Sequence, residues 1–114
     1  MGNPREAPVI DRERLQELRH EIGEEDFAEV VTMFLDEMRA SLQDLRNTPA
    51  MAGQDALHGL RGSALNLGFT DFADACTKAE HRAAAGQPVD VVYLDWLFSE
   101  SVSSVRTDLP ATVA

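Results

Sequence analysis

The chain has 114 residues, of which 44% are hydrophobic, and a formal net charge of −10, which fits one globular domain with a single core. So acidic a chain is a poor partner for nucleic acids and anionic membranes, because binding their phosphates requires clustered Lys and Arg, and its charge favours a monomer. Cys76 is the single cysteine, and no apolar run is long enough to span a bilayer, so the expected location is the cytoplasm.

The first predicted elements are a leader and a short helix. Residues 1–10 contain glycine and proline without any apolar period, which predicts a flexible leader. Asp11 is a suitable N-cap for a helix that Gly23 ends. The apolar face of this first helix comprises Leu15, Leu18 and Ile22.

A wide apolar stripe predicts that the second helix is the longest and runs to about Leu45. The stripe comprises Phe27, Val30, Val31, Phe34, Leu35, Met38, Leu42 and Leu45. The third helix has two possible beginnings: Thr48 as N-cap with Pro49 at the first helical position, or a later start marked by Gly53. Gly68 closes it, and its predicted buried face comprises Leu57, Leu60, Ala64 and Leu67.

The last two predicted helices are also bounded by turn and capping residues. The fourth opens near Thr70, and the turn at residues 86–88 ends it. Asp90 caps the fifth, which is predicted to extend to about Leu109. The expected buried side chains are Phe72, Cys76, Ala79 and Ala83 in the fourth helix, and Val91, Leu94, Leu97, Phe98, Val102, Val105 and Leu109 in the fifth.

Four long amphipathic helices joined by short loops predict an all-α fold, an antiparallel up-down four-helix bundle. The first helix is too short to span such a bundle and is expected to lie over one end. The bundle is predicted to cover residues 11–109, with residues 110–114 as a frayed tail.

The third predicted helix carries the residues best suited to chemistry. Because the apolar face of this helix turns inward, His58 points to solvent or to the rim of the bundle. Its neighbours on the helix surface are Gln54, Asp55, Arg61, Gly62 and Leu65. Arg61 places a permanent cation beside the imidazole and can bind phosphate oxygens as a fork. Gly62 leaves the adjacent surface bare, so that a partner can approach. The alternative for Gly62 is close packing against another helix.

Residues 58–68, HGLRGSALNLG, resemble the signature of histidine-containing phosphotransfer (HPt) domains: His, any residue, Leu, Lys, Gly, Ser, small residues, an apolar residue and Gly. The matching positions are His58, Leu60, Gly62, Ser63, Ala64, Leu67 and Gly68. The order and length of the helices extend the resemblance over nearly the whole chain. The sequence departs from this signature at two positions. Arg61 stands where the family usually has Lys, and Gly59 follows the histidine where larger residues are common.

The resemblance implies a covalent relay. Neutral Nε2 of His58 attacks a phosphoryl group and forms a phosphohistidine, while the other ring nitrogen donates to an acceptor that fixes the tautomer. The family places an acidic or amide residue for this purpose on the following helix, and Glu80 occupies the matching position. Arg61 is then expected to meet the phosphoryl oxygens.

The implied partner is the receiver domain of a response regulator, a hybrid histidine kinase, or both. Docking is expected over Gln54, Gly62 and Leu65. The sequence has no GxxxxGK[ST] nucleotide-binding loop and no carboxylate cluster suited to Mg²⁺. We therefore expect no cofactor and no metal in this chain, with the metal and the aspartate supplied by the partner, and a carrier without independent catalytic turnover.

Two alternatives stay open: a helical protein-interaction module that is not phosphorylated, with His58 idle, and a domain excised from a hybrid histidine kinase. His81, beside Glu80, is a rival phosphoacceptor that lacks the glycine-serine context. His20 is interpreted as a cation near the C-terminus of the first helix. The three histidines have no spacing typical of metal ligands.

Overall fold

The computed structural model describes residues 8–47 and 54–110. These contain five α-helices and no strand, so the predicted all-helical fold is confirmed. The helices are α1 (Arg12–Ile22), α2 (Glu24–Asn47), α3 (Gln54–Leu67), α4 (Thr70–Ala84) and α5 (Val91–Ser104), followed by the short 3₁₀ helix η2 (Arg106–Asp108). None of the described helices combines the length and apolarity needed to cross a membrane.

Parts of the sequence predictions fall outside the described residues. These parts are residues 1–7 of the leader, the alternative start of the third helix at Thr48, and residues 111–114 of the tail. Within the described residues α3 begins at Gln54, directly after Gly53. Residues 8–10 have no regular structure, and the backbone N–H of Val9 donates to Oδ2 of Asp71 at 2.7 Å.

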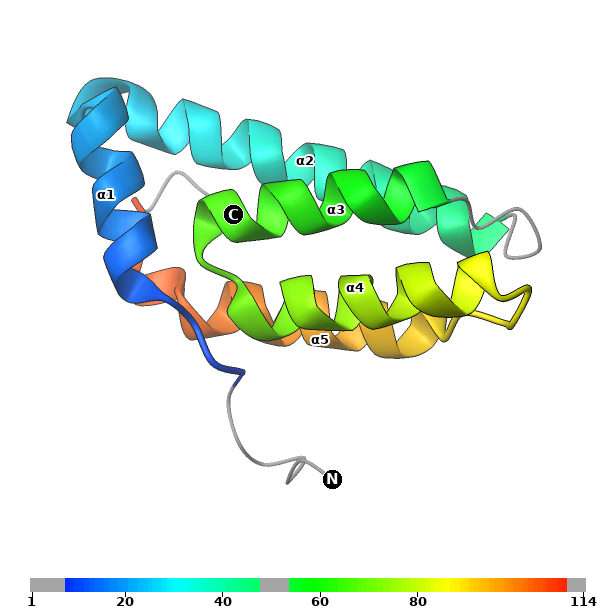
Figure 1. Ribbon diagram of the computed structural model, residues 1–114. Coiled ribbons are helices and arrows are strands. Elements are labelled where there is room, and N and C mark those ends of the chain that lie inside the picture. The colour runs from blue at the N-terminus through cyan, green and yellow to red at the C-terminus, as the bar shows by residue number, and fades with distance from the viewer. Residues whose placement is uncertain (1–7, 48–53, 111–114) are drawn as a thin grey trace.

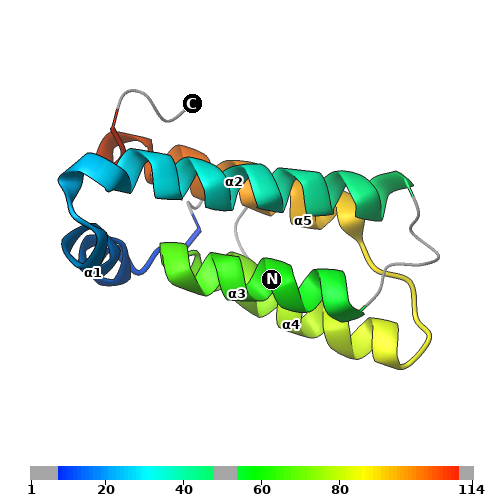
Figure 2. The same ribbon diagram turned by 90° about the horizontal axis from the view of Figure 1, so that it is seen from above.

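The long helices lie side by side, and α1 lies across one end of them (Figure 1). Seen from above, α2 covers α5, while α3 lies beside α4 (Figure 2). Along the chain, α2 and α4 run away from the α1 end, and α3 and α5 return towards it. α3 has its most extensive contact with α4 and also packs on α2 and α1. This arrangement leaves one face of α3 open to solvent.

The predicted apolar stripes form most of the core, although Ile22, Ala83 and Leu109, which were also predicted on buried faces, are only half-buried. α2 buries Phe27, Val31, Leu35, Met38, Leu42 and Leu45, and α3 buries Leu57, Leu60, Ala64 and Leu67. Val30 and Phe34, at the edges of the α2 stripe, are half-buried. On the opposite side of the core, the ring of Phe98 packs edge-on against Phe72, with centroids 5.8 Å apart. The stripes therefore fix which face of α3 turns outward.

Helix ends follow the capping residues in the sequence. Oδ1 of Asp11 accepts from the backbone N–H of Arg14 at 3.1 Å, and Oδ1 of Asp90 accepts from that of Tyr93 at 3.0 Å. Each contact satisfies one of the backbone donors that a helix N-terminus leaves free.

The predicted extension of the fifth helix to Leu109 is wrong, because α5 ends at Ser104. Two arginines of α1 bind the backbone carbonyls at this end. Nη2 of Arg12 donates to the carbonyl of Ser104, and Nη2 of Arg19 to that of Asp108, each at 2.7 Å. Because these contacts join residues about ninety positions apart, the local pattern could not reveal them.

Gly68, between α3 and α4, is required by the fold. Its φ is +75°, its carbonyl accepts from the N–H of Asp11 at 2.7 Å, and a Cβ there would overlap the carbonyl oxygen of Asp11. We expect Gly68→Ala to lower the free energy of unfolding by about 2–4 kcal/mol, measured by urea denaturation. Gly59→Ala is the matched control, since nothing lies within 4 Å of its Cβ position, and should stabilise α3 by up to about 1 kcal/mol. Equal stabilities of the two variants would contradict this role of Gly68.

Candidate functional site

His58 lies on the solvent face of α3. Its neighbours Leu57 and Leu60 are turned into the core, with exposures of 0% and 1%, whereas the side chain of His58 is 69% exposed. Within the described residues, Nε2 has no hydrogen bond or ion pair, so this ring nitrogen faces solvent. An exposed, unengaged nitrogen is available to an incoming group.

Arg61 and Glu80 converge on the other ring nitrogen. Nη2 of Arg61, one turn along α3, lies 2.9 Å from Nδ1 of His58. Oε1 of Glu80, from α4, lies 3.9 Å from the same nitrogen. The structure therefore brings together His58, Arg61 and Glu80, the residues whose chemical roles were predicted from the sequence. Arg61 contacts the ring directly, and the Glu80 carboxylate lies farther from it.

Arg61 and Glu80 are themselves neighbours at the α3–α4 contact. Nε of Arg61 lies 3.4 Å from Oε1 of Glu80, and their side chains are 34% and 20% exposed. These two atoms are buried, and neither has a hydrogen-bond partner within the described residues. The opposite charges attract each other, but the N–H of Arg61 is not directed at the Glu80 oxygen well enough to make a hydrogen bond.

Cys76, one turn before Glu80 on α4, has 0% exposure. The pKa of its thiol is raised from 9.0 to about 12, mainly by burial and also by the Glu80 carboxylate, while the Arg61 guanidinium opposes the increase. This is the small core residue that the sequence suggested, placed next to the charged pair. A buried neutral thiol is chemically inert.

We expect native Cys76 to resist iodoacetamide near neutral pH, because the thiolate is the reactive species and the pKa is raised to about 12. The neutral thiol's contribution to the stability of the fold is fully present when the pH is below the unfolded pKa of 9.0. It is lost as the pH rises through the folded pKa of about 12. Mass spectrometry of alkylated native and urea-unfolded protein checks the first point. Equal alkylation rates in the two states would contradict it.

The three predicted docking residues all lie on the surface of α3. Gln54 and Gly62 are exposed, and Leu65 is 53% exposed. A Cβ at Gly62 would meet nothing within 4 Å. Close helix packing is therefore not the reason for Gly62, and that alternative is wrong.

Sequence reasoning missed residues of α2 that lie beside this surface. Glu37 and Ser41 line a shallow hollow of about 100 Å³ together with Gly59 and Ser63 of α3. Nothing in the sequence distinguishes Glu37 and Ser41 from other solvent-facing residues of α2. Only the register between the two helices places them next to the histidine helix.

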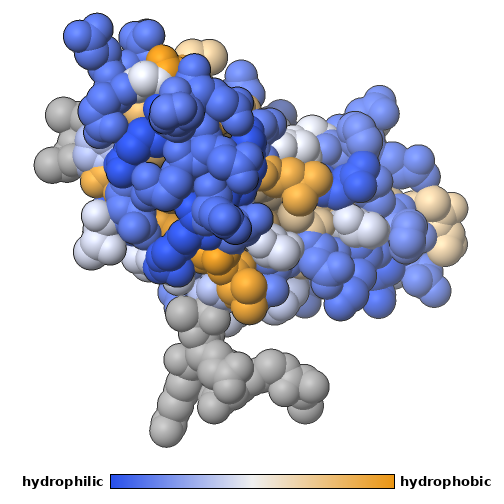
Figure 3. Space-filling view, turned by 60° about the vertical axis from the view of Figure 1, so that its left-hand side comes forward, coloured by the Kyte–Doolittle hydropathy of each residue, from blue (hydrophilic) through white to orange (hydrophobic). Residues whose placement is uncertain are grey.

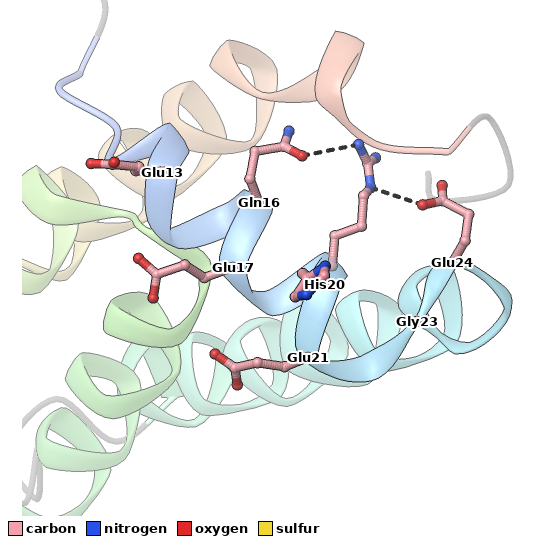
Figure 4. A pocket seen from close by; sticks show the side chains of 8 residues that line it. Glu13, Gln16, Glu17, His20, Glu21, Gly23 and Glu24 are labelled. Carbon is pink, nitrogen blue, oxygen red and sulfur yellow. Dashed lines mark hydrogen bonds and ion pairs between the residues drawn. The ribbon is translucent and has the colours of Figure 1, made fainter.

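The other two histidines are apart from this cluster. His20 is exposed in the last turn of α1, among acidic side chains that include Glu17 and Glu21 (Figure 4). The end of the molecule that α1 covers is predominantly hydrophilic (Figure 3). His81 is exposed on α4. Within residues 8–47 and 54–110, neither ring has a hydrogen bond or an ion pair, and no group of His, Cys, Asp and Glu could hold a metal ion.

Comparison with known proteins identifies the family of this chain. The family model of the Hpt domain matches residues 29–108, which is well over half of the chain. No curated protein and no solved structure gives a significant match. Domains of this family carry phosphoryl groups in two-component signalling and interact with receiver domains. On the extent of that match, the chain belongs to the Hpt domain family.

Proposed function

We propose that this Hpt domain carries a phosphoryl group on Nε2 of His58, between receiver domains or from a histidine kinase to a response regulator. The observation that carries the proposal is the environment of the ring. His58 is 69% exposed with Nε2 unengaged, while Arg61 and Glu80 gather at Nδ1. His20 and His81 lack such an environment among the described residues.

The transfer is a nucleophilic displacement at phosphorus. The lone pair of Nε2 attacks the phosphoryl group of a receiver's aspartyl phosphate, the P–N bond forms, and the bond from phosphorus to the carboxylate oxygen breaks. In the tautomer that reacts, Nδ1 carries the ring proton, and Glu80 accepts a hydrogen bond from it. Arg61 binds the phosphoryl oxygens as charge develops on them. The receiver supplies the aspartate and the metal, so this chain needs no cofactor and is a carrier without turnover.

The proposal includes the remaining expectations for the chain. We infer an antiparallel up-down four-helix bundle from α2 to α5 with α1 as an additional helix, within a domain of residues 11–109 between a leader and a tail. The opposite directions of successive helices support the bundle. The receiver docks over Gln54, Gly62 and Leu65, and the protein acts as a cytoplasmic monomer.

Transfer from a phosphorylated receiver domain tests the proposal. A purified receiver is charged with a radiolabelled phosphoryl group, freed of donor and mixed with this chain. We expect label to pass to the chain as acid-labile, base-stable phosphate, the stability pattern of a phosphohistidine. Binding of receivers without any transfer of label would favour a non-phosphorylated interaction module, and would overturn the carrier function.

A further inference from the structure

Arg61, and not Glu80, makes the hydrogen bond to Nδ1 of His58. The Arg61 Nη2 to Nδ1 distance is 2.9 Å, whereas the nearest oxygen of Glu80 is 3.9 Å away, beyond hydrogen-bond distance. A guanidinium can only donate, so Nδ1 accepts with its lone pair. The neutral ring therefore carries its proton on Nε2.

This tautomer is unable to perform the proposed reaction. With the proton on Nε2, that nitrogen has no lone pair free to form a P–N bond. The nucleophilic tautomer has its proton on Nδ1 and needs an acceptor there. Oε1 of Glu80 can be that acceptor, but only when the guanidinium of Arg61 no longer binds Nδ1.

Two buried polar atoms at this contact lack hydrogen bonds, which makes a second arrangement favourable. Nε of Arg61 and Oε1 of Glu80 are 3.4 Å apart, and both are without a hydrogen-bond partner in the described part of the chain. Buried polar atoms in this condition are costly. A bond from Nδ1–H of His58 would satisfy the carboxylate, and phosphoryl oxygens would satisfy the guanidinium.

We propose that Arg61 is a positioning residue that sets the tautomer of His58. At rest it holds the ring with its proton on Nε2, which is non-nucleophilic. An incoming phosphoryl group draws the guanidinium onto its oxygens, and Nδ1 then exchanges Arg61 for Glu80. The inference rests on the proposed function, because it assumes that His58 is the phosphoacceptor.

The proton balance of this switch is simple because the ring is exposed to water. One proton leaves Nε2 for the solvent and one is taken up at Nδ1, so the charge of the ring does not change. The freed lone pair of Nε2 then forms the P–N bond while the bond to the aspartyl oxygen breaks. Because of this switch, His58 adopts its nucleophilic tautomer only when a phosphoryl group is present.

In this mechanism an arginine at position 61 can do what the family's usual lysine cannot. Two different nitrogens of Arg61 face two groups, Nη2 towards Nδ1 of His58 and Nε towards Glu80. A lysine ammonium is a compact point charge without such a fork. We therefore expect Arg61→Lys to have a tautomer ratio between those of wild type and Arg61→Ala.

Nitrogen-15 NMR of the His58 ring in the unphosphorylated chain tests the proposal, at a pH where the ring is neutral. Wild type should show a protonated Nε2 and an unprotonated Nδ1. Arg61→Ala should move the ratio towards protonated Nδ1 by about tenfold to a hundredfold, the size of one hydrogen bond to a charged group. Adding Glu80→Ala should reverse that gain. Arg106→Ala is the control, because it removes the same charge from the exposed helix η2.

A protonated Nδ1 in wild type would overturn the proposal, as would a ratio in Arg61→Ala equal to that in Arg106→Ala. These outcomes are distinguishable from failure of the proposed function, because the ratio is measured without any phosphate. If His58 never accepts label from a receiver, the proposed function fails even when the Arg61 hydrogen bond is present.

Discussion

His58→Gln should abolish phosphorylation of the chain and leave its fold intact. The side chain is 69% exposed, and surface substitutions usually change stability by no more than about 0.5 kcal/mol. Glutamine has an amide in place of the ring, and an amide nitrogen has no lone pair able to form a stable P–N bond. The measurement is label uptake from a phosphorylated receiver, with circular dichroism and urea denaturation to check the fold.

His81→Gln is the matched control for this variant, since His81 is also exposed and lies next to Glu80. It should take up label like wild type. Full labelling of His58→Gln would show that the acceptor is elsewhere, and loss of labelling in His81→Gln alone would identify His81 as that acceptor.

Much of the fold was predictable because local rules determined it. Asp11 and Asp90 cap the helices that they were predicted to cap, and the apolar period identified the buried face of α3 in full. The error at the end of α5 has a non-local cause. Arg12 of α1 binds the carbonyl of Ser104, the last residue of α5, and Arg19 binds that of Asp108 beyond it. No periodicity within the fifth helix reveals such contacts.

The composition of the site was predictable, but its hydrogen bonding was not. The outward direction of His58 follows from helix periodicity, and the approach of Glu80 from α4 was implied by family resemblance. The sequence suggested Arg61 on phosphoryl oxygens, whereas its guanidinium lies 2.9 Å from Nδ1. That orientation depends on the carboxylate of Glu80 across the helix contact, 3.4 Å from Nε of Arg61, and hence on tertiary packing.

Gly62→Gln should block transfer between this chain and a receiver without harming the fold. Gly62 is exposed one turn from His58, and a Cβ there meets nothing within 4 Å, so α3 can accept the side chain and gain up to about 1 kcal/mol from the lost glycine. The glutamine would then occupy the surface over which the receiver must bring phosphorus to Nε2. Because a misplacement of about 1 Å can cost a hundredfold in rate, we expect at least that loss.

Phosphoramidate, a small donor with a P–N bond, separates a docking role for Gly62 from a chemical one. It needs no protein surface, so Gly62→Gln should take up phosphate from it as wild type does while failing to exchange with a receiver. Ser103→Gln, an exposed substitution on α5, should leave both reactions unchanged. Loss of both reactions in Gly62→Gln would mean that the new side chain acts on His58 itself. Unchanged exchange with the receiver would show that the partner does not approach across Gly62, and that the two helical glycines of α3 serve another purpose.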